Sequence, residues 1–244
     1  MSALDERLYR TYASTHAGVG DAASTAVVYR RDIRPCLPAE AAGTTVLDLG
    51  CGRGDLVQLL DADGFTAHGV DISAEQVRLA HDRGLRSVRL GDIHDVLTSS
   101  DGAWDAVVAT DFLEHLDKAE ALRTFDNVRR ALRPGGLFLA RVPNAVSPTG
   151  GHIMFADLTH QTWYTQRSVR QLAAVAGFAA VRTFACPPVA HGGWSLARAL
   201  LWKPISGLLK LALAAETGQL RGHIVTHNLM FAAYRDAEQP GGCR

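Results

Sequence analysis

The sequence has no excess of charge of either sign, since 25 lysine and arginine residues balance 25 aspartate and glutamate residues among 244. It also lacks a long basic run. Proteins that bind nucleic acids usually show one or the other, because the phosphate backbone supplies much of the affinity. We therefore expect no nucleic acid among the partners.

Cysteine pairs of the C-x-x-C kind are also missing, and no cysteine and histidine spacing is typical of a zinc site. The four cysteines are predicted to be reduced thiols: Cys36, Cys51, Cys186 and Cys243. Residues 1–20 lack the apolar stretch that follows a basic start in a signal peptide. These observations favour a cytoplasmic protein.

Internal repeats and low-complexity runs are absent as well, and 47% of the residues are hydrophobic, which is enough for one substantial core. We expect a single domain over residues 1–244. It consists of N-terminal helices in 1–40, a core of alternating elements over 44–143 and a looser segment over 144–235.

Apolar runs predict strands at 45–49, 65–70, 86–90, 104–109, 137–142, 178–184 and 223–234. Apolar periodicity and capping residues predict helices at 4–13, 22–37, 54–62, 73–82, 117–132, 168–176 and 194–215. Strands that alternate with helices indicate βαβ units and a mainly parallel sheet. Ligands of such sheets bind beyond the carboxyl ends of the strands, so the chemistry is expected in the loops that follow them.

The loop after the first strand is rich in glycine. Gly50, Cys51, Gly52 and Gly54 form a G-x-G-x-G turn, in which glycine lets the backbone turn sharply and approach a ligand. Asp48 precedes this turn at the end of the strand, where its carboxylate can attract an ammonium group. A dinucleotide site would instead offer the next helix N-terminus to a pyrophosphate, which Asp55 would repel.

Two further acidic residues follow the next two strands. Asp71 closes the second strand, where a carboxylate can accept hydrogen bonds from both ribose hydroxyls. Asp92 follows the third strand and could accept from an adenine amino group. Each aspartate alone could equally be a helix cap or a turn former, but acids at three successive strand ends favour a ligand-binding role.

The order of these motifs resembles the class I S-adenosylmethionine-dependent methyltransferases. The matching segments are Val46 to Gly54, Val70 to Ile72, Gly91 to Ile93, Trp104 to Val108, Glu114 to Leu116 and Leu132 to Leu137. The resemblance implies a Rossmann-like α/β fold with a seven-stranded, mostly parallel sheet whose last strand is antiparallel. It also implies S-adenosylmethionine as cofactor. The expected cofactor contacts are Asp48, Gly50, Cys51, Gly52, Gly54, Asp71, Ile72, Asp92, Ile93 and Thr110.

Two histidines lie in loops on the expected ligand side of the sheet. His115 follows the fourth strand, and His160 lies in the irregular segment after the fifth. Methyl transfer to a hydroxyl requires removal of its proton, for which histidine is the usual base near neutral pH. We predict that His160 is the general base, oriented by Asp157, with His115 beside the sulfonium; the ordinary alternative for each histidine is a packing role.

A divalent metal is a further expectation from the resemblance. Some relatives use an acid-x-x-Glu-His cluster and a later histidine to hold a metal ion near the acceptor, where it acts as a Lewis acid. The corresponding residues are Asp111, Glu114, His115 and His160, and the ion would be Mg²⁺ or Mn²⁺. The Glu-His-Leu sequence also occurs in relatives without metal, so this alternative stays open.

The acceptor is expected from residues 157–178, which resemble bacterial methyltransferases found with glycan-assembly enzymes. This implies a sugar hydroxyl of an oligosaccharide or polysaccharide precursor, with methylated mannose polysaccharides as one candidate. Trp163, Tyr164 and Trp194 could stack on sugar rings or simply pack. The alternatives are O-, N- or carboxyl methylation of a small natural product, a non-catalytic protein that binds S-adenosylmethionine, and an NAD-dependent oxidoreductase, which the glycine spacing disfavours.

The apolar stretch 194–215 is long enough to suggest a membrane span. Its internal charges, Arg198, Lys203 and Lys210, argue against a span, and Pro204 is expected to interrupt the helix. We expect a lid over the acceptor site or a contact in a homodimer. A helix lying in the plane of a membrane surface is the alternative.

Overall fold

The computed structural model describes residues 8, 22–189 and 193–236, so the predicted helix at 4–13 lies almost wholly outside the described residues. One sheet contains β1 (Thr45–Leu49), β2 (Thr66–Asp71), β3 (Val88–Leu90), β4 (Trp104–Thr110), β5 (Leu132–Pro143), β6 (Ala180–Ala185) and β7 (Asn228–Tyr234). The strand order is β3-β2-β1-β4-β5-β7-β6. The first five strands are parallel, and β7 runs antiparallel between β5 and β6. The predicted fold class is confirmed.

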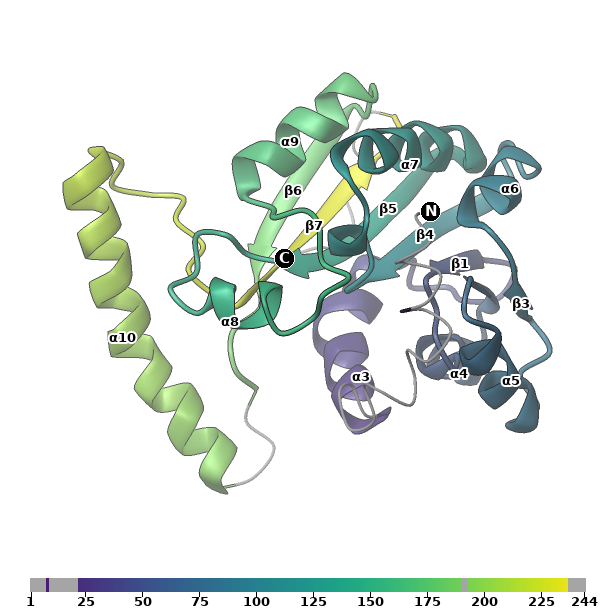
Figure 1. Ribbon diagram of the computed structural model, residues 1–244, viewed down its shortest axis with the longest axis horizontal. Coiled ribbons are helices and arrows are strands. Elements are labelled where there is room, and N and C mark those ends of the chain that lie inside the picture. The colour runs from purple at the N-terminus through teal and green to yellow at the C-terminus, as the bar shows by residue number, and fades with distance from the viewer. Residues whose placement is uncertain (1–7, 9–21, 190–192, 237–244) are drawn as a thin grey trace.

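Helices cover both faces of this sheet (Figure 1). They are α3 (Ala22–Val28), α4 (Asp55–Ala62), α5 (Ala74–Asp82), α6 (Ile93–Thr98), α7 (Lys118–Ala131), α8 (Gly150–Met154), α9 (Gln166–Val175) and α10 (Gly193–Thr217). Short turns of other helix types occupy Tyr29–Ile33, Arg34–Cys36 and Leu113–His115. The helices α6, α7 and α9 lie on one face, and α3, α4 and α5 lie on the other.

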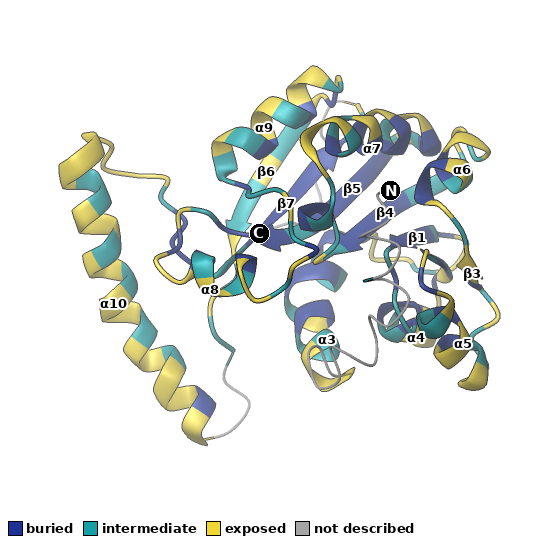
Figure 2. Ribbon diagram, viewed as in Figure 1, coloured by how far each residue is buried: buried dark blue, intermediate teal, exposed yellow. Residues whose placement is uncertain are grey.

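The sheet is buried on both faces (Figure 2), which explains its nearly continuous apolar strands. Successive residues of β1 enter opposite layers, because side chains alternate along a strand. Val46 packs with Val57 of α4, whereas Leu47 packs in the layer that contains Phe125 of α7 and Phe138 of β5. The Phe125 and Phe138 rings meet edge to face, with centroids 5.1 Å apart. This rigid core fixes the loops at the carboxyl edge.

Three local predictions need correction. Helix α6 was not predicted, although Asp92 caps it by accepting a 2.7 Å hydrogen bond from the backbone of His94. Strand β5 begins at Leu132 instead of at residue 137, after Gly135 and Gly136. Its register with β4 shifts between Trp104 and Ala106. Pro204 does not interrupt α10. It lies on an exposed turn, where water can bind the carbonyl that loses its donor.

The cysteines follow the prediction only in part. Cys51 and Cys186 are free thiols, but Cys36 is disulfide-bonded, so the prediction of reduced thiols is wrong for that residue. Among the helices that the structure describes, none combines the length and the apolar character required to cross a bilayer.

Candidate active site

The loop between β1 and α4 forms the sharp glycine turn that the sequence predicts. Gly50, Gly52 and Gly54 have φ angles of 66°, 54° and 77°, in the left-handed region that other residues rarely adopt. A side chain on Gly50 would collide with the loop after β4, because its Cβ would lie 2.4 Å from Cδ2 of Phe112. The backbone N–H groups of Gly50 and Cys51 both donate to Val70 O, at 2.9 and 3.1 Å. These two hydrogen bonds fix the glycine turn to the carboxyl end of β2.

Two of the predicted acids lie at this turn. Asp71 accepts 2.8 Å hydrogen bonds from the backbone N–H groups of Gly52 and Ser73, which join the loops after β1 and β2. Asp48 is buried, and among the described residues its Oδ1 has no hydrogen-bond partner. Burial, and secondly the charge of Asp71, raise the pKa of Asp48 well above its usual value. An ammonium or hydroxyl donor would satisfy this orphaned oxygen.

The remaining predicted cofactor residues surround the same edge without forming contacts that test their role. Ile72 is exposed beside Asp71, and Thr110 ends β4. Asp92 is exposed and caps α6, the ordinary role considered for it, and Ile93 behind it is buried in the core. Their contacts with a nucleoside remain predictions.

The irregular segment after α8 crosses the loop after β4 and is fixed there by hydrogen bonds. The backbone N–H groups of Gln161 and Thr162 donate to Glu114 O, at 2.7 and 3.1 Å. The Tyr164 hydroxyl donates to Leu113 O at 3.0 Å. Tyr164 is therefore a buried packing residue, and its hydroxyl is occupied. These bonds bring His160 to the loop that carries His115.

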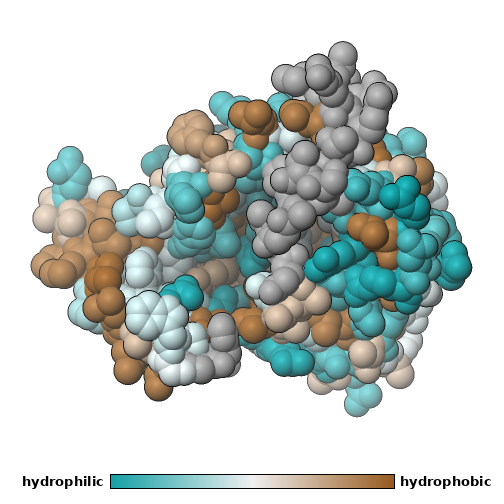
Figure 3. All heavy atoms as spheres, turned by 60° about the horizontal axis from the view of Figure 1, so that its bottom comes forward, coloured by the Kyte–Doolittle hydropathy of each residue, from teal (hydrophilic) through white to brown (hydrophobic). Residues whose placement is uncertain are grey.

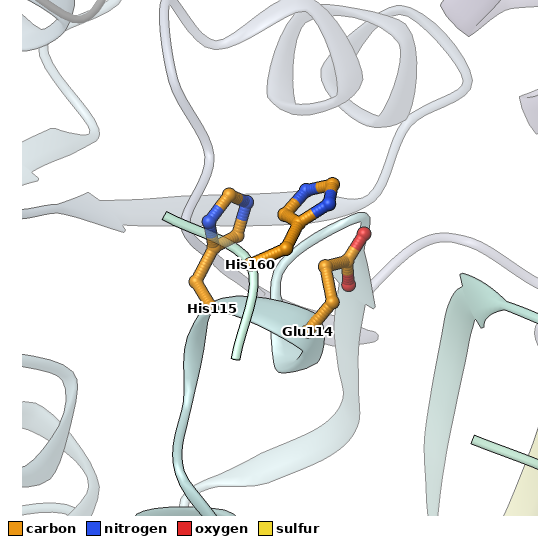
Figure 4. A group of neighbouring side chains, drawn as sticks. All are labelled: Glu114, His115 and His160. Carbon is orange, nitrogen blue, oxygen red and sulfur yellow. The ribbon is translucent and has the colours of Figure 1, made fainter. Parts of the chain in front are cut away.

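Three of the four predicted metal-ligating residues converge (Figure 4). Glu114, His115 and His160 each offer a ligand atom, and these atoms lie within 4.8 Å of one another. The two imidazole rings meet edge to face with centroids 4.7 Å apart. Within the described part of the chain, Glu114 Oε2 and His160 Nδ1 are buried and lack hydrogen-bond partners. Such orphaned atoms are unusual in a folded protein, and a bound water, an ion or a ligand would satisfy them.

Asp157 lies behind both histidines. Its Oδ1 accepts a 2.7 Å hydrogen bond from Thr159 Oγ1, which in turn lies 2.7 Å from His115 Nδ1. Because the Thr159 hydroxyl uses its proton on Asp157, His115 Nδ1 is the donor in the second bond. Nε2 of His160 lies 4.0 Å from Asp157 Oδ2, so this ring nitrogen faces the carboxylate.

Burial controls the charges of this cluster. It lowers the pKa of His115 to about 4, and the neighbouring His160 acts in the same direction. His115 is therefore neutral at physiological pH and available as a base or a ligand. Burial and the nearby Asp111 raise the pKa of Glu114 well above its usual value. A cation between these groups would favour ionised Glu114 and relieve that cost.

Asp111, the fourth predicted metal ligand, lies outside this cluster. Its carboxylate forms a bidentate ion pair with Arg141, in which the Nε to Oδ1 distance is 2.9 Å. Its φ of 52° is the one positive value among the non-glycine residues described. Strained backbone is often found at functional sites, and here it directs Asp111 to β5.

Sequence reasoning did not identify three residues that shape the site: Phe112, Thr159 and Arg141. Phe112 lies against Gly50, Thr159 links Asp157 to His115, and Arg141 holds Asp111. Thr159 could have been suspected from its place between Asp157 and His160. The contacts of the other two depend on β4 and β5 being adjacent, which local patterns do not encode.

Comparison with known proteins gives a consistent result. Residues 23–183 match a family model described as a methyltransferase domain. The chain is similar to a ubiquinone biosynthesis O-methyltransferase of Xanthomonas oryzae, with 34% identity over 107 residues, or 41% of this chain and 44% of that protein. It thus spans less than half the length of this curated relative.

Solved structures share the fold. A SAM-dependent methyltransferase from Archaeoglobus fulgidus superposes with a TM-score of 0.69 at 20% identity, covering 91% of this chain and 98% of that one. Phosphoethanolamine N-methyltransferase 2 of Haemonchus contortus, solved in complex with S-adenosyl-L-methionine, has a TM-score of 0.61 at 17% identity. That match covers 96% of this chain and 60% of the other. At such identities the likeness concerns the fold.

Proposed function

The chain belongs to the methyltransferase domain family, and on that premise we propose that it transfers a methyl group from S-adenosylmethionine to a hydroxyl oxygen. When bound, S-adenosylmethionine supplies an electrophilic methyl group. The orphaned Oδ1 of Asp48 and the carboxylate of Asp71 would hold its polar ends at the glycine turn. Gly50 and Gly52 have φ angles of 66° and 54°, so the turn has a backbone conformation that residues with side chains rarely adopt. These residues fit the cofactor.

The observation that carries the assignment of hydroxyl chemistry is the convergence of Glu114, His115 and His160 at the loop after β4. Phe112 of the same loop lies against Gly50 of the turn. His160 accepts the proton of the acceptor hydroxyl at Nδ1, the buried atom without a hydrogen-bond partner in the described chain. Asp157 faces the opposite nitrogen and stabilises the imidazolium that forms. Positioning the oxygen in line with the transferred methyl contributes most of the remaining acceleration, roughly 7–11 kcal/mol in well-oriented systems.

A metal-assisted form of the same reaction is the second candidate. Glu114 Oε2 and His160 Nδ1 are both orphaned, and His115 is neutral, so the three groups together fit a divalent cation. Two imidazoles and one carboxylate suit Mn²⁺ better than Mg²⁺, which prefers oxygen ligands. The cation would lower the pKa of the acceptor hydroxyl, and His160 would then be a ligand instead of a base.

Two acceptor classes follow from different observations. The resemblance of residues 157–178 to glycan-associated enzymes favours a saccharide hydroxyl, and Trp163 of this segment is partly exposed and could stack on a sugar ring. The relative in Xanthomonas oryzae is named for ubiquinone biosynthesis, which favours the hydroxyl of a ubiquinone precursor. We propose the saccharide, with methylated mannose polysaccharides as the first candidate, and treat the quinone precursor and other small natural products as alternatives.

The test is incubation of the purified chain with methyl-labelled S-adenosylmethionine and a panel of saccharides, ubiquinone precursors and small hydroxylated compounds, each with and without EDTA. Mass spectrometry then identifies any acceptor that gains one methyl group. Methylation of a saccharide alone supports the full proposal, and methylation of a quinone precursor alone overturns the saccharide assignment. Activity lost in EDTA and restored by Mn²⁺ supports the metal-assisted form. Cofactor binding without transfer to any acceptor would favour a non-catalytic role.

A further inference from the structure

The 25-residue helix α10 lies apart from the rest of the fold. Figure 1 shows it beyond the carboxyl ends of the strands, the end of the sheet at which the candidate site lies. Ser195 is the one buried residue of this helix. A helix of this length normally buries an apolar stripe against its own domain, so its outer surface needs a different explanation.

The two faces of α10 differ in character. Most residues that are at least partly buried recur with helical spacing and form the face toward the protein: Ser195, Ala199, Trp202, Ser206, Leu209 and Leu213, with Ala214 beside them. The opposite face is apolar and open to solvent. It carries Leu200, Leu201, Leu208 and Leu211, whose exposed fractions are 55, 63, 68 and 67%. Figure 3 shows hydrophobic atoms gathered along this side of the molecule.

Basic residues border this exposed apolar face. Lys203 and Lys210 lie two turns apart along one side of it, and Arg198 lies on the other side. All three are exposed, and Glu216, in the last turn, is the only acidic residue of the helix. Trp194, at the start of α10, is 80% exposed. Leucine, flanking lysine and arginine, and a terminal tryptophan are residue types that helices in a membrane interface share.

We propose that α10 is a docking helix that lies flat on an anionic lipid bilayer. Its leucine face enters the boundary between headgroups and acyl chains, while Arg198, Lys203 and Lys210 bind anionic headgroups. The segment that carries His160 also exposes large apolar side chains that could enter the bilayer, because Phe155 and Leu158 are 80 and 86% exposed. Docking would therefore present the acceptor side of the enzyme to molecules held at a membrane surface.

A second copy of the chain fits this face less well. In a two-fold contact centred on the middle of the helix, the edge with Lys203 and Lys210 would lie beside the same edge of its partner. Like charges at such a distance repel, whereas anionic headgroups neutralise both lysines and release counterions. The charge pattern therefore favours an anionic lipid surface over a second copy of the chain. A lid would not explain why the outer face is apolar.

The experiment is flotation of the full chain with vesicles of phosphatidylcholine alone or mixed with phosphatidylglycerol, which requires neither cofactor nor acceptor. We expect flotation with the anionic vesicles, weakened by salt, and little with the neutral ones. The double substitution Lys203→Gln and Lys210→Gln should weaken partitioning by roughly 25-fold, about fivefold for each basic residue near the surface. Leu200→Gln combined with Leu208→Gln should abolish it.

The matched control is Arg86→Gln combined with Arg123→Gln, which removes two exposed arginines elsewhere and should leave flotation unchanged. Retained binding of S-adenosylhomocysteine by each variant verifies its fold. The proposal is overturned if the wild-type chain does not float with anionic vesicles. It is also overturned if the control variant loses as much flotation as the Lys203→Gln and Lys210→Gln variant. A concentration-dependent dimer in ultracentrifugation that Leu200→Gln and Leu208→Gln abolish, without vesicle binding, would assign the face to a second copy.

Discussion

The imidazole rings of His115 and His160 meet edge to face with centroids 4.7 Å apart, although one residue follows β4 and the other lies in the irregular segment beyond β5. Their contact depends on the hydrogen bonds that fix residues 161–164 to the Glu114 loop. The proposed chemistry depends on that pairing, because it brings two basic nitrogens and a buried carboxylate to one point.

Substitution of His160 by alanine should abolish most turnover while leaving cofactor binding intact. Loss of a general base typically costs a factor of roughly 10²–10⁴. Steady-state rates and titration with S-adenosylhomocysteine measure the two properties separately, with His223→Ala, in the loop after α10, as the control. Near-normal turnover of His160→Ala would refute its assignment. Electron paramagnetic resonance of Mn²⁺ distinguishes the two roles proposed for His160. If His160 is a metal ligand, His160→Ala releases the bound ion, whereas if it is only a base the ion stays bound.

The neutral state of His115 should make stability depend on pH in a defined window. Its pKa falls from 6.5 to about 4 in the folded protein, so between these values the unfolded chain binds a proton that the folded chain does not. The free energy of unfolding therefore decreases as the pH falls through this window, by about 1–3 kcal/mol from this group.

Urea denaturation at about pH 7.5 and about pH 4.5 checks this, with His115→Gln as the comparison. The substitution should remove that part of the pH dependence, and the pH dependence that it leaves comes from the buried carboxyl groups. Identical pH dependence in both proteins would show that His115 does not carry a lowered pKa.

Gly50→Ala should destabilise the protein and weaken cofactor binding. The new Cβ meets Phe112 at 2.4 Å in a backbone with φ of 66°, so clash and backbone strain act together. Gly102→Ala is the matched control, because Gly102 has φ of 63° and open space around its Cβ position. We expect Gly50→Ala to cost at least about 1–2 kcal/mol more than the control in thermal or urea unfolding. Equal destabilisation by Gly50→Ala and Gly102→Ala would mean that the Phe112 ring moves aside without cost.

Asp71→Asn should lower the affinity for S-adenosylmethionine by about 10–100-fold, the usual effect of losing hydrogen bonds to a charged group. The amide would also place a donor against the N–H of Gly52 or Ser73, both of which now donate to the carboxylate. Calorimetric titration measures the effect, and Asp82→Asn, an exposed position on α5, serves as the reference. Unchanged affinity in Asp71→Asn would remove this residue from the cofactor site.

The elements predicted correctly were those whose sequence signals are local and strong. The runs around Leu47 and Val107 fit buried parallel strands. Asp117, the first residue of the helix predicted at 117–132, caps α7 by accepting a 2.8 Å hydrogen bond from the backbone N–H of Glu120. Helix α6 was missed because it is short, and because a ligand-binding role was preferred for Asp92 over the helix cap that it forms. The glycine pair before Leu137 resembles a turn locally, but pairing with β4 extends the strand through it.

Residues of the candidate site could be placed from the sequence where they directly follow a strand, because the strand ends of a parallel sheet lie at one edge. Asp48, Asp71 and the glycines follow from that logic, as does the placement of His115. The ion pair of Asp111 with Arg141 was not predictable, because it depends on the side-by-side arrangement of β4 and β5. The open face of α10 was likewise undetermined, since its apolar composition alone fits a buried, an associating or a membrane-bound helix.

Calorimetric titration of the purified chain with S-adenosylhomocysteine, and in parallel with NAD, tests the account most directly. The strand-end carboxylates and the glycine turn predict saturable binding of the first compound at one site and no heat from the second. No detectable affinity for S-adenosylhomocysteine, or tighter binding of NAD, would contradict the entire assignment of the site.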